Sequence, residues 1–117
     1  MMKLFPEDVA EGIVATLQRV IAARHDLITR AHDVCGKIGV SYQVNDPKNP
    51  AILRIDVDAP APPHSSAKDV YLARLEIDKE TGRMRFFRDG YQPLENQFLL
   101  EEHPFIVQQI ANTIWNN

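Results

Sequence analysis

The stretch VAEGIVATLQRVIAARHDLITRAHDVCGKI, residues 9–38, decides the fold because it is the only long segment of the chain with a helical hydrophobic period. Its apolar residues recur every three or four positions, and at about 100° per residue they fall within a band roughly 140° wide. This pattern predicts a helix with one buried face. The helix is expected to begin at Pro6 or Glu7, where a proline and acids suit a helix N-terminus, and to end near Gly36 as a C-cap glycine.

Arg24 is a charged residue inside this apolar band. An unbroken helix of about thirty residues would be roughly 45 Å long, whereas strands of about eight residues cover only about 27 Å. Two alternatives follow: a kink or break near Ala23–Asp26, or a straight helix that overhangs its sheet. An unpaired buried arginine is too costly. The Arg24 head group is therefore expected in one of three places: in water at a helix break, in a dimer interface, or at the rim of a pocket.

Four segments with period-two alternation follow the helix. Their inward-facing sets are Val40, Tyr42 and Val44; Leu53, Ile55 and Val57; Tyr71, Ala73, Leu75 and Ile77; and Met84 and Phe86. Residues 79–82 predict a tight hairpin with Gly82 at a positive φ, and a final helix is expected from near Pro104. The sequence therefore predicts a single α+β domain over residues 1–117, in the order α-β-β-β-β-α. A four-stranded antiparallel meander carries the long N-terminal helix across one face, and a C-terminal helix ends the domain.

Charge pairing predicts the register of the meander. When Ile77 opposes Met84, Glu76 faces Arg85 and Asp78 faces Arg83. When Ile55 opposes Leu75, Asp56 faces Arg74 and Arg54 faces Glu76. A two-residue shift of the second pair would oppose Arg54 to Arg74, which like charge disfavours.

Composition bounds the class of protein. The chain has 117 residues, of which 44% are hydrophobic and 25% charged, as in ordinary soluble globular domains. Its 13 basic and 16 acidic residues give a net charge of −3, which supplies no broad positive field for nucleic acid. Residues 1–8 do not read as a signal peptide, no run approaches the length of a membrane span, and one cysteine excludes an internal disulfide. We expect a cytoplasmic protein that binds neither nucleic acid nor a membrane.

The dipeptide His-Asp occurs at residues 25–26 and again at 32–33, which raises the question of a metal site. The two histidines would lie about 10 Å apart along a helix, and only His64 and His103 remain as further histidine ligands. Arg30 stands at ion-pair spacing from both aspartates, which is typical of a solvated helix face. We expect no metal and no cofactor.

Three other stretches could carry chemistry. Cys35 lies in the centre of the apolar band, where a free cysteine is usually a core residue. Residues 64–66, His-Ser-Ser, lie in a proline-rich loop without an orienting carboxylate. Residues 83–88 mix arginine and phenylalanine as nucleic-acid-binding strands do, yet period-two alternation turns Phe86 into the core. We expect no catalytic residues, although the question of an enzyme stays open.

Surplus apolar residues indicate a surface for a partner. Ile52, Val70, Leu72 and Phe87 all fall on the outer, otherwise polar face of the predicted sheet. Either the C-terminal segment folds across this face and covers it, or the face is exposed and binds a protein partner. The second alternative makes these four residues, together with Arg24, the candidate partner surface.

The sequence thus favours a non-enzymatic cytoplasmic protein-interaction module that forms a homodimer. Its specific role is not contained in the sequence. The alternative is a small-ligand-binding protein or a small enzyme with a pocket between the long helix and the sheet. Tyr42, Tyr71 and Arg24 would then line the pocket, the tyrosines offering an apolar wall with a polar tip.

Overall fold

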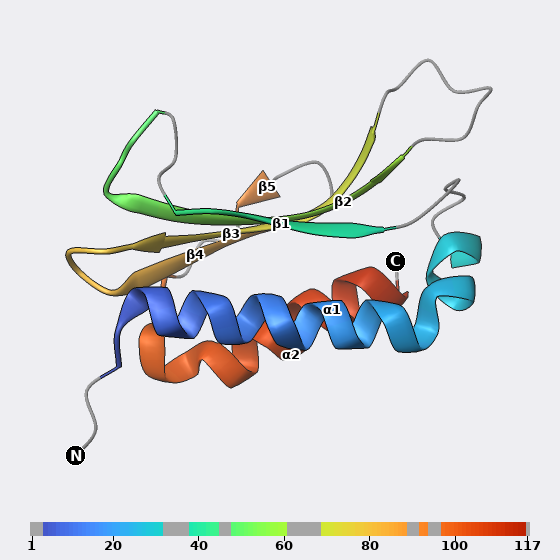
Figure 1. Cartoon of the computed structure of the whole chain (residues 1–117), viewed down its shortest axis with the longest axis horizontal. Coiled ribbons are helices and arrows are strands. Elements are labelled where there is room, and N and C mark those ends of the chain that lie inside the picture. The colour runs from blue at the N-terminus through green and yellow to red at the C-terminus, as the bar shows by residue number, and fades with distance from the viewer. Residues whose placement is uncertain are drawn as a thin grey trace.

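The computed structural model describes residues 4–31, 38–44, 48–60, 69–88, 92–93 and 97–116, with the side chains of residues 25–31, 69–71, 88, 92–93 and 113–116 left aside. Figure 1 shows a sheet above two helices. The elements in chain order are α1 (Pro6–Ala31), β1 (Gly39–Gln43), β2 (Ile52–Pro60), β3 (Asp69–Asp78), β4 (Arg83–Arg88), β5 (Gln92–Pro93), β6 (Phe98–Leu99), a 3₁₀ turn (Leu100–Glu102) and α2 (His103–Asn116). The predicted α+β fold with a four-stranded antiparallel meander is confirmed.

Helix α1 begins at Pro6, as predicted, and carries Glu7 and Asp8 in its first turn. It is not straight: Arg24 has non-helical backbone angles (φ −135°, ψ 24°), and the ribbon turns there toward the sheet (Figure 1). The part before Arg24 holds about eighteen residues and is about 27 Å long, close to the roughly 30 Å that the nine residues of β2 span. The helix therefore changes direction where its sheet ends. The predicted C-cap Gly36 lies outside the described residues.

Strands β1 to β4 form an antiparallel meander in sequence order. The register predicted from charge pairing is confirmed at Leu75↔Phe86 and Glu76↔Arg85 between β3 and β4. It is also confirmed between β2 and β3, at Arg54↔Glu76, Ile55↔Leu75 and Asp56↔Arg74. The hairpin between β3 and β4 closes as predicted, with Gly82 at φ 72° and its N–H bonded to the Asp78 carbonyl at 2.8 Å.

The period-two pattern of β3 is broken at one position. Val57 pairs with Ala73, but the next residue of β2, Asp58, pairs with Tyr71, so Leu72 is an extra residue in β3. Such a bulge turns the side chain of the inserted residue out of strict alternation. Leu72 is accordingly only 2% exposed and belongs to the core. Of the two alternatives for the outer face, exposure is therefore wrong for Leu72.

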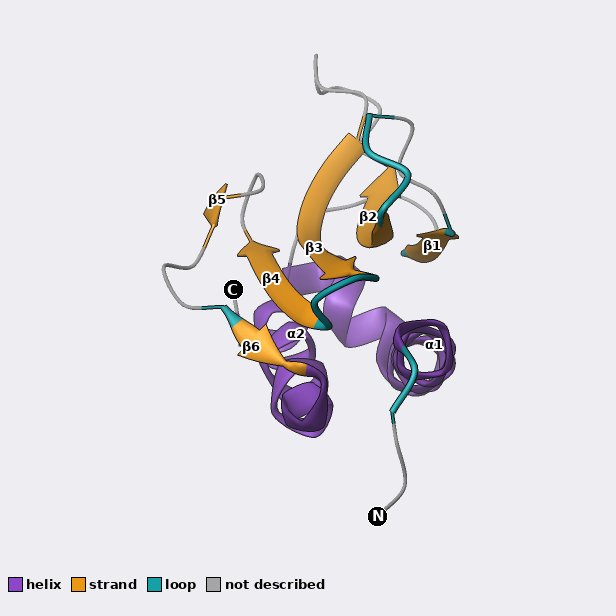
Figure 2. Cartoon of the chain, turned by 90° about the vertical axis from the view of Figure 1, so that its left-hand side faces the viewer, coloured by secondary structure: helices purple, strands orange, loops and turns teal. Residues whose placement is uncertain are grey.

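Both helices cover the same face of the sheet. Figure 2 shows α1 and α2 side by side beneath the strands, with α1 under β1 and α2 on the side of β4 and β6, and the two helices pack against each other. The alternative in which the C-terminal segment covers the outer face is therefore wrong for α2. The core between helices and sheet includes Ile13, Leu17, Leu53, Ile55, Leu75, Phe86, Ile106 and Ile110, all at most 1% exposed.

The two edges of the sheet differ. The outer edge of β4 is covered by two short strands, with Phe87 paired to Pro93 of β5 and Arg83 paired to Leu99 of β6. On the opposite side, β1 pairs only with β2 among the described strands. Among the described strands, one edge of the sheet is thus covered, and the other, called the open edge below, carries no further strand.

Candidate interaction surfaces

The open edge is formed by β1, whose sequence is Gly-Val-Ser-Tyr-Gln. Val40 and Tyr42 pack partly against the core, and Ser41 between them is exposed. Val44, directly after the strand, is 52% exposed. Edge strands are commonly protected from pairing by lysine, proline, inward charges or a bulge, and β1 contains none of these devices. Its backbone is a template for one further strand.

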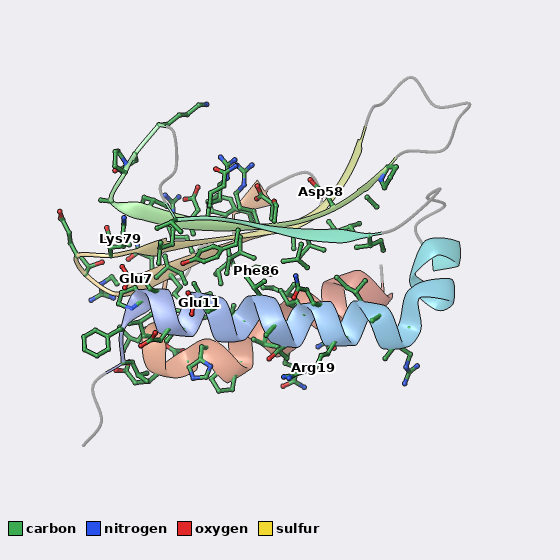
Figure 3. All side chains as sticks on the ribbon, in the orientation of Figure 1. Glu7, Glu11, Arg19, Asp58, Lys79 and Phe86 are labelled. Atoms are coloured by element: carbon green, nitrogen blue, oxygen red, sulfur yellow. The ribbon has the colours of Figure 1, made fainter. Side chains whose placement is uncertain are left out.

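Tyr42 is a partly buried residue of β1 that packs against the core. Burial raises the pKa of the Tyr42 hydroxyl, and the nearby carboxylates of Glu11 and Glu7 raise it further. Figure 3 shows Glu7 and Glu11 on the N-terminal turns of α1, on the side below the sheet. The raised pKa favours the neutral form of the phenol, which can donate a hydrogen bond. β1 and α1 pack against each other.

The residues proposed for a pocket are not all brought together. Tyr42 lies beside Glu11, whereas Arg24 is thirteen residues farther along α1, about 20 Å away along the helix. Arg24 is exposed at the kink. Tyr71 pairs with Asp58, and its side chain lies outside what is described. The space between α1 and the sheet is instead filled by apolar core side chains, which disfavours a pocket at that place.

The outer face of the sheet is dominated by charge. Asp56 is only 6% exposed and lies between two arginines. Its carboxylate is 2.7 Å from Nε of Arg74 and 3.2 Å from Nε of Arg54. A nearly buried carboxylate needs such partners, because an unpaired one would carry a large desolvation cost. This triad ties β2 to β3 on the side away from the helices.

The predicted partner surface on this face is smaller than expected. Ile52 and Phe87 are half-buried there, and the Arg85 guanidinium lies over the Phe87 ring, 5.3 Å from its centroid. Leu72 is in the core, and the side chain of Val70 lies outside the described set. Arg24 belongs to α1, beneath the opposite face (Figure 1). The five predicted residues therefore do not form one continuous patch.

A shallow hollow of about 530 Å³ opens on the same face at the end of the β3–β4 hairpin. Its lining mixes cations and carboxylates, among them Lys48, Glu76, Asp78, Arg83 and Arg85. One oxygen of Asp78 is already used by the hairpin, where it accepts the N–H groups of Glu80 at 2.8 Å and Thr81 at 3.1 Å. Charges of both signs side by side are typical of a solvated sheet face, and the hollow has no dominant sign.

The remaining predicted stretches are only partly visible. Cys35, His64 and residues 32–33 lie outside the described residues, and so do the side chains of residues 25–26. Within the part of the chain that can be examined, no group of three or more His, Cys, Asp or Glu residues could hold a metal ion. In the same part, no helix is long and apolar enough to cross a membrane.

Comparisons with protein-family models, with curated proteins and with solved structures gave no match. The surfaces of the chain are therefore the basis for inferring its function. Sequence reasoning pointed to the outer face, and it missed the edge strand β1. The composition of residues 39–43, which contain no charged residue and no proline, could have indicated this edge strand.

Proposed function

We propose that this chain is a non-enzymatic cytoplasmic protein-interaction module that forms a homodimer by pairing β1 with β1 of a second copy. The observation that carries the proposal is the open edge of β1, opposite an edge that β5 and β6 cover. An unprotected edge offers unpaired backbone N–H and C=O groups, and a second strand satisfies them. A reducing compartment suits a chain with a single cysteine.

A symmetric dimer has a definite register. Two identical strands that pair antiparallel are related by a two-fold axis, and a five-residue strand overlaps fully with its copy only when the axis passes its middle residue. That residue is Ser41. Val40 of each copy then opposes Tyr42 of the other on the inner face, a β-branched and aromatic pair that is favourable across strands.

The interface includes more than the strand. β1 spans about 17 Å, and because α1 lies beneath β1 (Figure 2), the pairing also brings the two α1 helices side by side. A small interface of this kind fits a dissociation constant in the micromolar range.

Sedimentation velocity from about 1 to 100 μM tests the proposal in this affinity range. We expect the wild type to shift from monomer to dimer across the series. Ser41→Lys should stay monomeric, since two cations would meet at the two-fold axis, and the exposed position of Ser41 keeps the fold intact. Gln108→Lys, which makes the same charge change at an exposed position of α2, should behave like the wild type.

Two results would reject the proposal. One is a wild type that stays monomeric throughout the series. The other is a Ser41→Lys variant that dimerises as well as Gln108→Lys, because the interface would then lie elsewhere.

A further inference from the structure

A second surface, separate from β1, lies between the two helices. A groove of about 280 Å³ opens between the first turns of α1 and the start of α2. Its wall is apolar on both sides, with Leu4, Val9 and Ile13 from the α1 side and Val107 from α2, next to His103. A groove of this volume can hold one or two large apolar side chains.

Gly12 lines this groove, and nothing in the packing of the chain requires a glycine at this position. Glycine inside a helix costs about 0.5–1 kcal/mol relative to alanine. A methyl group added at Gly12 would meet nothing within 4 Å, and the residue is exposed. The chain therefore gains nothing by packing from the absence of a side chain here. What the glycine does provide is room for another backbone or side chain to approach α1 closely.

The groove carries carboxylates on its α1 wall and at its α2 end. Asp8 lines the groove, and Glu101 and Glu102 directly precede His103, which also lines it. Within the described part of α1 the first basic residue is Arg19. The two helix N-termini contribute roughly half a positive charge each. Three carboxylates outweigh them, so the field at the groove is negative.

We propose that this groove binds an amphipathic helix of a partner protein, with apolar side chains in the groove and a flank of lysine and arginine. Recognition of a helix by an apolar groove uses anchors spaced by one helical turn, and complementary charge at the rim steers and selects the partner. The proposal goes beyond the β1 dimer and uses no residue of β1.

The test uses two fluorescein-labelled helical peptides that share the same leucine anchors and differ in their flanks, one with lysines and one with glutamates. Fluorescence anisotropy with the full chain is expected to give a micromolar dissociation constant for the lysine peptide and at least about tenfold weaker binding for the glutamate peptide. Gly12→Leu, which fills the groove, should weaken binding of the lysine peptide at least about tenfold. Ala15→Leu adds the same side chain at an exposed position of α1 that does not line the groove, and it should leave binding within about twofold.

Thermal unfolding of both variants controls for the fold, and we expect each to be at least as stable as the wild type, because leucine is a better helix former than glycine and about as good as alanine. Equal affinity of the Gly12→Leu and Ala15→Leu variants would overturn the proposal. So would equal binding of the two peptides, or no binding of either below about 1 mM. A Gly12→Leu variant that lowers the sedimenting mass of the chain itself would overturn it as well, since the occupant would then be a second copy.

Discussion

The carboxylate of Asp56 is the most constrained charge on the outer face. It is almost fully buried and is shared by Arg54 and Arg74, whose side chains are about one-fifth exposed. Solvent therefore screens part of the attraction, and the interaction is weaker than in a fully buried ion pair. The pairing of Asp56 with Arg74 was predictable, because opposite charges faced each other in the alternation of two strands. The participation of Arg54, two residues away on the same strand, was not.

Asp56→Asn is expected to lower the free energy of unfolding by about 1–3 kcal/mol, since two guanidinium groups then face each other without their shared anion. Urea denaturation followed by circular dichroism measures the change. Glu80→Gln removes a carboxylate at an exposed turn position and should alter stability by less than about 0.5 kcal/mol. If Asp56→Asn were as mild as Glu80→Gln, the triad would contribute nothing to stability.

At the scale of elements, the sequence predicted the kind, order and register of the main strands because two independent patterns agreed. The apolar residues set the faces, and the charged residues set the pairing. The break in α1 was one of two predicted alternatives, and the length of the sheet explains why it falls at Arg24. The bulge in β3 was missed, because strict alternation was assumed through a stretch without glycine or proline. Its signal was Leu72 itself, an apolar side chain at an apparently polar position.

Leu72→Ala tests this bulge. Because Leu72 is buried in the core, its truncation should lower the free energy of unfolding by about 2–5 kcal/mol. Ile52→Ala removes a side chain of similar size from a half-buried position on the outer face, and we expect a loss of about 1 kcal/mol or less. Guanidinium denaturation of the two variants in parallel provides the comparison. Similar small losses for both would place Leu72 on the surface after all.

At the scale of the whole molecule, α2 could not be placed from the sequence. Both faces of the predicted sheet carried apolar residues, and the pattern of α2 shows only that one of its sides is buried. The structure puts both helices on one face and leaves charged side chains on the other. Because β5 and β6 cover the edge of β4 while β1 carries no further described strand, the candidate interaction site is the edge strand β1 rather than the outer face of the sheet. Only the composition of β1 was visible in advance.

A cysteine placed on the proposed two-fold axis gives a direct prediction for the assembled molecule. In a Cys35→Ser background, Ser41→Cys should form a disulfide between two chains under mild oxidation, because directly opposed residues on paired antiparallel strands have Cα atoms at about the separation that a disulfide requires. Non-reducing gel electrophoresis would show a band of twice the chain mass. Gln108→Cys in the same background is expected to stay monomeric. Equal yields from both variants would indicate random collision rather than a defined interface.

The unequal edges of the sheet also limit how far association can go. A chain with two bare margins could recruit copies at either side without end, as fibres do. Here β5 and β6 cover one edge of the sheet. A dimer formed through β1 would therefore have only covered edges on its outside. Growth then terminates after a single joining event. In the proposed dimer, β5 and β6 would thus act as a stop against polymerisation.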